Sequence, residues 1–197
     1  FPFYAYGDHG RGDRFGRPMG PMGWFESNLV QIHDPEHIWH DPRGKTFHIL
    51  MRAQTGATNV AGLLKALEGD DGKVVDSVEK APSGEPIFLL PFPGGQNRFH
   101  VTYDEKTKLY WLLGLQTTDS MKRVELLNPK RWGLPKDERH RLSLHFSKNL
   151  VDWCFAGLVA DAGDDGQSRH YGPLIIDGGD LQIICRSAGP AAANAHN

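Results

Sequence analysis

The phrase Asp104-Glu-Lys-Thr-Lys-Leu109-Tyr-Trp-Leu-Leu-Gly114 joins a chain reversal that carries an Asp to a short apolar strand. The same arrangement occurs from Asp41 to Arg52 and again from Asp177 to Arg186. The last residues of the three phrases are 62 and 72 residues apart. This spacing is longer than a solenoid repeat and close to one propeller blade with long loops. The repeat therefore predicts an all-β protein built from successive antiparallel sheets.

A second repeat supports the first. The stretches 24–30 and 153–159 place Trp, Leu and Val at the same offsets, and each precedes an Asp-bearing reversal. Together the repeats predict a partial β-propeller domain over residues 24–197, after a Gly- and Pro-rich loop segment at 1–23. The expected four-stranded blades are 31–82, 85–160 and an incomplete 167–197. Because three blades do not close a ring, we expect a fragment of a five- or six-bladed propeller whose remaining blades lie elsewhere in the parent chain.

Short strands dominate the chain after residue 28. The expected strands are 29–32, 38–39, 47–54, 59–68, 74–78, 99–103, 109–116, 142–146, 155–159, 171–176 and 181–187. Residues 59–68 have the Ala, Leu and Lys content of a short helix, but their place after a hairpin favours a strand. The irregular loop 117–141 carries Pro129, Pro135 and many charges, so it is expected to form the rim of a site.

Composition excludes several classes of protein. The 197 residues are 39% apolar and 23% charged, with a net charge of -2, which gives no general attraction to nucleic acid or anionic membranes. No apolar run reaches the roughly 18 residues of a membrane span. The chain begins without Met or a signal peptide, so we expect a piece of a longer protein. Cys154 and Cys185 lie in apolar runs and are expected to be buried and unpaired.

The best local motif is Ser147-Lys-Asn149-Leu150-Val-Asp152-Trp153, which follows the apolar strand 142–146. It predicts a tight turn that Ser and Asn side chains close through backbone hydrogen bonds, with Trp packed beneath. The motif resembles the Asp-box of sialidases, Ser-x-Asp-x-Gly-x-x-Trp, and the Ser-x-Asp-Leu-x-x-Trp form of five-bladed glycoside hydrolases. Here Asn149 replaces the Asp and the Gly is absent. Such turns lie on the outer rim, so the motif indicates a propeller and not a catalytic role.

Residues 24–197 as a whole resemble the sialidase-like propeller proteins known as exo-alpha-sialidase or BNR-repeat proteins. The resemblance is carried by Trp24-Phe-Glu-Ser-Asn, Gly95-Gln-Asn-Arg-Phe-His100, Tyr110-Trp-Leu-Leu, Thr118-Asp-Ser-Met121, Leu144-His-Phe-Ser-Lys-Asn, Arg169-His-Tyr171 and Asn194-Ala-His196. It implies a carbohydrate substrate, an axial pocket, and a secreted or periplasmic location, with no cofactor.

Sialidases bind the sugar carboxylate with an arginine triad and use a Tyr nucleophile with a Glu partner and an Asp acid/base. The Arg-Ile-Pro phrase that supplies the first triad arginine is missing from this chain. Polar residues on the innermost strands of a propeller converge on the axial pocket. The expected catalytic residues are Glu26, Asp34, Asp119 and Tyr171. The expected substrate-binding residues are Arg52, Arg98, His100, His170, Arg186 and His196.

A dense group of potential metal ligands occurs at His33-Asp34, His37 and His40-Asp41. If this stretch were a strand, His37 and His40 would point to opposite faces, so we expect no metal centre there. The leading hypothesis is a glycoside hydrolase of sialidase type that acts on terminal sugars, acidic or neutral, in an axial pocket. The alternative is a non-catalytic carbohydrate-binding or scaffolding propeller whose pocket has lost its acid/base pair.

Overall fold

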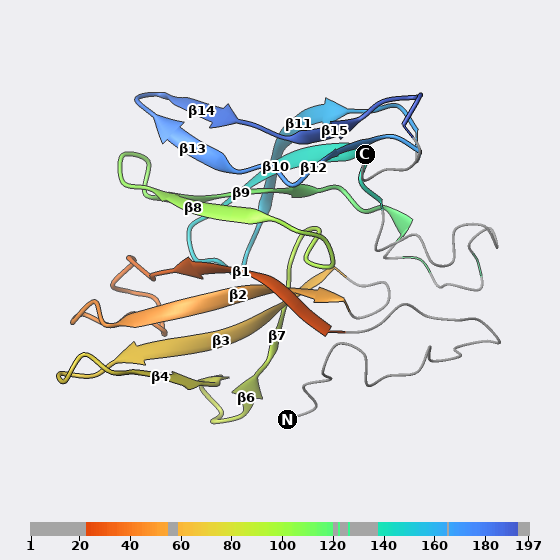
Figure 1. Cartoon of the computed structure of the whole chain (residues 1–197). Coiled ribbons are helices and arrows are strands. Elements are labelled where there is room, and N and C mark those ends of the chain that lie inside the picture. The colour runs from red at the N-terminus through yellow and green to blue at the C-terminus, as the bar shows by residue number, and fades with distance from the viewer. Residues whose placement is uncertain are drawn as a thin grey trace.

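The computed structural model describes residues 23–54, 59–119, 122, 126, 138–164 and 166–192. These residues form antiparallel strands and turns with no α-helix, which confirms the predicted all-β class (Figure 1). Within the same ranges there is no helix long and apolar enough to cross a membrane. His196 and the expected loop at 1–22 lie outside the described residues.

The first sheet is an antiparallel meander of four strands that pair in chain order. Its strands are β1 (Gly23–Val30), β2 (Thr46–Gln54), β3 (Val60–Glu68) and β4 (Val74–Ser77). The short strand β7 (Leu89–Pro91) pairs with the beginning of β3, where β4 does not reach. Between β4 and β7 the chain forms a small ribbon of β5 (Glu79–Lys80) and β6 (Pro86–Ile87). Residues 60–68 are therefore a strand, as predicted, and not a helix.

The second sheet repeats this plan. Its strands are β8 (His100–Asp104), β9 (Leu109–Leu115), β10 (Arg141–Ser147) and β11 (Cys154–Asp161). Two short ribbons follow it along the chain. They pair β12 (Ser168–His170) with β15 (Arg186–Ala188), and β13 (Leu174–Asp177) with β14 (Asp180–Ile183). The sheets are stacked in chain order and do not close into a ring within the described part of the chain (Figure 1).

Alternation along β9 explains why the second sheet is buried on both faces. Tyr110 and Leu112 belong to an apolar cluster with residues of the first sheet, such as Leu50 and Leu63. The intervening Leu113 and Leu115 belong to a second cluster, with Leu142 of β10 and Leu174 of β13. Successive side chains of a strand point to opposite faces, so one strand supplies both cores. The second sheet is thus the middle layer of a stack.

The β3–β4, β8–β9 and β10–β11 turns lie at the same end of the molecule, which we call the turn end. It holds residues 69–73, 105–108 and 148–153. Here the loop after β1 reaches the second sheet. His33 stacks on Tyr103 with ring centroids 4.2 Å apart, and His37 Nε2 lies 3.1 Å from the Asn149 carbonyl oxygen. The opposite end, where β2 and β9 finish and β8 and β10 begin, we call the polar end.

The Asp-bearing reversals are turns, as predicted. Asp41 accepts hydrogen bonds from the backbone two residues on (3.0 Å) and from the Thr46 hydroxyl (2.8 Å). These donors lower the pKa of its carboxyl to about 2. Asp104 repeats this arrangement, because its carboxylate accepts hydrogen bonds from the Lys106 backbone N–H (3.0 Å) and from the Thr107 hydroxyl (2.6 Å). Asp177 differs, since it accepts from the side chain of Gln182 at 2.5 Å.

The predicted turn at 147–153 is confirmed. Ser147 Oγ accepts from the backbone of Asn149 (3.1 Å) and of Leu150 (2.9 Å). Asn149 Oδ1 accepts from the backbone of the two residues after Leu150, at 3.0 and 2.8 Å. Leu150 has a φ of 63°, and Trp153 packs against Phe92 with ring centroids 5.2 Å apart. The turn joins the third strand of the second sheet to the fourth.

Two features of the predicted repeat are wrong. Trp24 lies on the first strand of its sheet, whereas Trp153 precedes the last strand of the other sheet, so the Trp-led stretches are not equivalent. The third Asp-bearing phrase also does not end like the others. Its strand finishes at Ile183, and Arg186 begins the separate strand β15. Only Arg52 and Gly114 therefore occupy matching second strands.

Two local predictions are also wrong. Residues 38–39 belong to a turn, because the His37 ring accepts the Trp39 amide hydrogen at 3.0 Å and local side-chain bonds of this kind replace strand pairing. Cys154 is exposed and Cys185 is half-buried, so the expectation of two buried thiols fails. Cys154 begins β11, an edge strand on which Phe155 and Leu158 are also exposed.

Candidate functional site

A turn at residues 92–97 joins the two sheets at the polar end. A methyl group on Gly94 would overlap the Leu115 backbone of β9, and one on Gly95 would overlap the Val60 backbone of β3. Gly94 also has a φ of 68°, which only glycine adopts without strain. Arg52 Nε donates to the Gln96 carbonyl at 2.9 Å. The turn is therefore packed between β3 and β9, and it places Arg98 at the polar end.

Tyr171 is the centre of the candidate site. The guanidinium groups of Arg98 and Arg139 lie 5.4 and 5.3 Å from the centroid of its ring. The His170 ring lies 4.3 Å from the Tyr171 ring, and Arg139 Nη1 lies 2.9 Å from His170 Nδ1. A guanidinium only donates, so His170 Nδ1 accepts and the imidazole is neutral, with its hydrogen on Nε2. Tyr171 itself has a φ of 51°, an uncommon value for a bulky residue.

Two arginines at this end have side chains available for a ligand. Arg98 is exposed and makes no hydrogen bond or ion pair with any described residue. Arg186 is also exposed and without such a partner in the described ranges, and its backbone pairs with that of His170 across the β12–β15 ribbon. Guanidinium groups are suited to binding carboxylates and hydroxyls. The site can therefore hold an anionic or hydroxyl-rich ligand.

Two buried carboxyl groups come from the ends of the loop 117–141. Glu138 Oε1 accepts hydrogen bonds from the backbone and hydroxyl of Thr118, at 3.1 and 3.0 Å. Both of its oxygens also accept from the Asp119 backbone, at 3.2 and 3.1 Å. Asp119 is 6% exposed, and its carboxylate lies 3.1 Å from Lys122 Nζ. These contacts join the two ends of the loop, whose residues 127–137 lie outside the described part of the chain.

His100 lies on the side of the site toward β13. Its Nδ1 accepts the Leu174 amide hydrogen at 3.2 Å. Burial, with a smaller effect of the Arg98 charge, lowers the pKa of His100 below its ordinary value. The ring is therefore kept neutral, with Nε2–H available as a donor.

Glu26 and Arg52 form a neighbouring pair at the same end. Arg52 is 5% exposed, and its Nη1 lies 3.5 Å from Glu26 Oε2 while its Nε donates to the Gln96 carbonyl. Arg52 thus braces the turn that carries Arg98. Asp34 lies apart from all these residues, at the turn end beside Tyr103. The structure therefore places Arg98 and His170 against Tyr171 and pairs the Arg186 backbone with that of His170. Asp119 contacts Glu138, the residue before Arg139, and Asp34 is separated from all of them.

The His- and Asp-rich stretch 33–41 is not arranged to hold a metal. Both ring nitrogens of His37 face backbone groups, of Trp39 and Asn149, and His40 Nδ1 lies 2.8 Å from the Ile32 carbonyl oxygen. In the described part of the chain, no group of three or more His, Cys, Asp or Glu side chains is placed to bind a metal ion.

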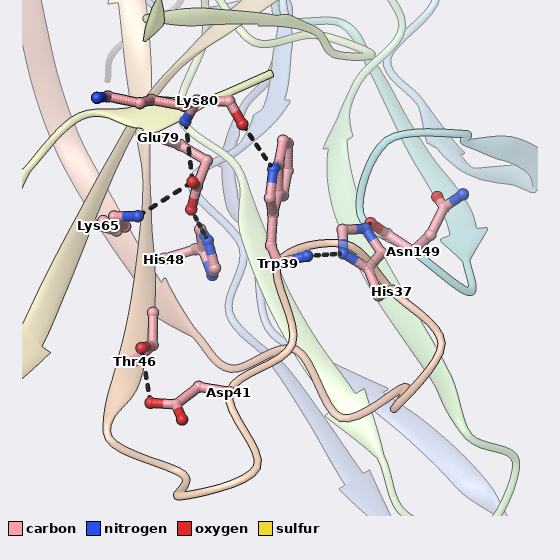
Figure 2. A network of polar contacts seen from close by, with 9 residues as sticks. All are labelled: His37, Trp39, Asp41, Thr46, His48, Lys65, Glu79, Lys80 and Asn149. Atoms are coloured by element: carbon pink, nitrogen blue, oxygen red, sulfur yellow. Dashed lines mark hydrogen bonds and ion pairs between the residues drawn. The ribbon is translucent and has the colours of Figure 1, made fainter. Parts of the chain in front are cut away.

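Sequence reasoning missed Glu138 and Arg139, which are both buried at the site. The signal available was the charged run Glu138-Arg139-His140 at the point where the loop meets an apolar strand. It also missed a buried network at His48, shown in Figure 2, where Glu79 lies 2.8 Å from His48 Nε2 and 3.1 Å from Lys65 Nζ. The Trp39 ring stacks on His48 at 5.5 Å. Nothing in local spacing relates these residues.

Comparison of the chain with known protein families and with curated proteins gave no match. Its function is therefore inferred from the geometry of the site.

Proposed function

We propose that this chain is part of a sialidase-like β-propeller that hydrolyses terminal, acidic sugars at the polar end. The observation that carries the proposal is the convergence of Arg98 and Arg139 on Tyr171, with Arg98 exposed and without an ion-pair partner among the described residues. A phenol flanked by two guanidinium groups can approach a cationic anomeric centre beside a bound carboxylate.

The stacking of the sheets supports the propeller part of the proposal. Two four-stranded meanders follow one another, and the second is packed on both faces. The Asp-box-like turn at 147–153 joins a third strand to a fourth and lies at the turn end, away from Tyr171. Radial stacking of such sheets is the plan of a propeller, whose site lies at one end of the axis.

In the proposed reaction Arg98 and Arg186 bind the sugar carboxylate and nearby hydroxyls, and His100 provides an imidazole that binds a sugar hydroxyl. The buried Arg139 and His170 hold the Tyr171 ring in position. Tyr171 attacks the anomeric carbon and releases its phenolic proton to solvent, while the glycosidic C–O bond breaks and Asp119 protonates the leaving oxygen. Water then attacks the anomeric carbon and gives one proton to the Asp119 carboxylate, and Tyr171 is released and regains its proton from solvent. Glu138 acts through Asp119, because it accepts hydrogen bonds from the Asp119 backbone and fixes its position. Arg52 and Glu26 hold the turn that positions Arg98.

A non-catalytic sugar-binding propeller is the second candidate, and the placement of the carboxyl groups favours it. Glu26 is paired with Arg52, both Glu138 oxygens accept backbone hydrogen bonds, and Asp34 is at the other end. Asp119 is then the remaining carboxyl for acid/base chemistry, and it is paired with Lys122. A pocket of this kind can bind a sugar without hydrolysing it.

The two functions are separated by assaying fluorogenic sialosides, glucuronides and neutral galactosides, together with binding to a glycan array. The hydrolase proposal expects turnover of an acidic sugar. It also expects Arg98→Ala to lower kcat/KM by about 100-fold on that sugar and far less on a neutral one. Lys106→Gln, on an exposed turn at the other end, is the matched control and should leave turnover unchanged.

Binding of acidic glycans without turnover would favour the non-catalytic function, provided Arg98→Ala abolishes that binding. Absence of both turnover and binding would contradict both functions. Tyr171→Phe separates them further, because it removes only the hydroxyl. It should abolish hydrolysis and leave glycan binding within about threefold.

A further inference from the structure

The turn end carries a second polar groove that the proposed function does not use. Its volume is about 520 Å³, within the range of small-molecule sites, and it is open along one side. Three separate loops form it: the segment after β1, the β8–β9 turn and the β10–β11 turn. Its main lining residues are His33, Asp34, Tyr103, Thr107, Lys108 and Lys148.

Two stacked rings, of His33 and Tyr103, line the groove, and the buried Tyr110 supports them from behind. Tyr110 is buried, Tyr103 packs on it with ring centroids 4.7 Å apart, and the exposed His33 stacks on Tyr103 at 4.2 Å. The Tyr110 hydroxyl fixes the outer ring, since it donates to the Gln31 carbonyl (2.6 Å) and accepts the His33 amide hydrogen (3.0 Å). The outermost ring is therefore held in place before any ligand arrives.

The charged groups of the groove balance one another. Asp34 Oδ1 accepts the Glu36 amide hydrogen at 2.9 Å, and Asp34 Oδ2 has no hydrogen-bond partner among the described residues. Lys148 likewise forms no ion pair within those residues. Lys108 lies 2.9 Å from Glu105, which offsets its charge. One carboxylate oxygen, of Asp34, and one ammonium group, of Lys148, thus remain available among the lining residues of the groove.

We propose that this groove binds a neutral sugar residue. The exposed His33 ring, held in place on Tyr103, can stack against the C–H face of a sugar. Asp34 can accept and Lys148 can donate hydrogen bonds to adjacent hydroxyls, and charged partners make such bonds stronger. A free anion such as phosphate is disfavoured, because Glu105 offsets the charge of Lys108 and Asp34 offsets that of Lys148.

The groove and the candidate active site lie at opposite ends of β8 and β9. Groove binding therefore does not depend on hydrolysis at the polar end, and it goes beyond the proposed function. A site at this distance would hold a remote part of a long glycan, or a glycan unrelated to the one hydrolysed.

The test is an amide-resolved NMR titration of the whole protein with methyl β-glucoside, methyl β-galactoside and N-acetylglucosamine, each up to about 50 mM, which detects binding weaker than 1 mM. We expect chemical-shift changes at residues 33–36, 103–108 and 148. His33→Ala and Asp34→Asn, both at accessible positions, should each weaken binding by about tenfold. Lys106→Gln lies on the same turn outside the groove and should not change the affinity.

Absence of these shifts with all three sugars would overturn the proposal, as would shifts that both groove variants leave unchanged. Inorganic phosphate is the second probe, and stronger binding of phosphate than of any sugar would also overturn it. Arg98→Ala should remove activity at the polar end and leave the groove titration intact, so failure of one proposal is distinguishable from failure of the other.

Discussion

The Nδ1 atom of His37 accepts a hydrogen bond from the backbone N–H of Trp39, over a distance of 3.0 Å. A backbone N–H only donates, so Nδ1 carries no hydrogen. His37 Nε2 lies 3.1 Å from the Asn149 carbonyl oxygen and must donate to it. The ring is thus neutral, and it connects the loop after β1 to the β10–β11 turn of the second sheet (Figure 2).

We predict that stability falls as the pH is lowered below 6.5. Burial lowers the pKa of His37, the Asn149 hydrogen bond opposes this, His48 lowers it further, and Asp34 and Glu79 raise it. The unfolded chain therefore binds this proton more tightly than the folded chain does. The neutral His37 ring therefore makes its full contribution to the free energy of unfolding at pH values above 6.5, its ordinary pKa. This contribution is lost as the pH falls through the lowered pKa of the folded state.

Urea unfolding from pH 7.5 to pH 5 measures this dependence. His37→Gln should reduce the slope of unfolding free energy against pH but not remove it, because burial also lowers the pKa of His100 and of His145. An unchanged slope in His37→Gln would contradict the assignment of a neutral ring.

Removal of Glu79 should be costly, since it is the carboxylate of the buried network in Figure 2. Burial opposes its ionisation, but hydrogen bonds from His48, the Lys80 amide and Lys65 lower its pKa to about 2. Glu79→Ala should lower the free energy of unfolding by roughly 3–5 kcal/mol, because it leaves buried partners unpaired. Chemical denaturation measures this, with the exposed Glu85→Gln expected within about 0.5 kcal/mol of wild type.

The Glu79 network should also make the free energy of unfolding decrease at acidic pH. Its lowered pKa means that its stabilising contribution is present above pH 4.5 and is lost as the pH falls toward about 2. This decrease at acidic pH should be smaller in Glu79→Gln. Equal acid sensitivity in Glu79→Gln and wild type would show that the ionised carboxylate does not stabilise the fold.

Gly94 should tolerate no side chain. Gly94→Ala places a methyl group against the Leu115 backbone at a φ of 68°, and should cost about 2–4 kcal/mol of unfolding free energy. Gly157→Ala is the matched control, because that position on β11 has open space and ordinary φ. Thermal unfolding of the two variants compares them directly. A Gly94→Ala protein as stable as Gly157→Ala would mean that the turn does not pack between the sheets as described.

Restoring the Asp of the Asp-box should not help this chain. Asn149 Nδ2 donates to Asp152 at 2.8 Å, and Asn149→Asp would place two carboxylates together. We expect a loss of about 1 kcal/mol, recovered in the double variant Asn149→Asp/Asp152→Asn. Ser147→Ala should cost about 1–2 kcal/mol, because two backbone N–H groups lose their acceptor. Stabilisation by Asn149→Asp alone would contradict the assigned direction of the Asn149–Asp152 bond.

Sequence reasoning succeeded where the determinants are local. The turn at Ser147 and Asn149 depends on residues within a few positions of each other, and the apolar run after Asp104 predicts the strand that the structure has at Leu109–Leu115. It failed at residues 38–39, where a hydrogen bond between Trp39 and His37 replaces strand pairing. The exposure of Cys154 was missed because apolar content does not distinguish an edge strand from a central one.

The site was predicted only in part, because it is assembled from distant segments. Tyr171, His170 and Arg98 were proposed from strand ends, and these do converge. Arg139 escaped notice because its contact with His170 spans 31 residues and depends on how β12 lies beside β10. Asp34 looked equivalent to the other carboxyls, but the end of the sheet at which a loop lies depends on strand direction, which spacing alone does not reveal.

The hairpin turns and the contacts between layers also differ in how they can form. Contacts within the hairpin turns, such as Asp104–Thr107 and Ser147–Leu150, join residues three positions apart, whereas contacts between layers, such as Arg52–Gln96 at the polar end and His37–Asn149 at the turn end, span 44 and 112. Short loops close at lower entropic cost and more quickly. We therefore expect the hairpin turns to form early during folding and the surroundings of Tyr171 to become ordered last, when the layers dock. The candidate active site would then form only after the layers have docked.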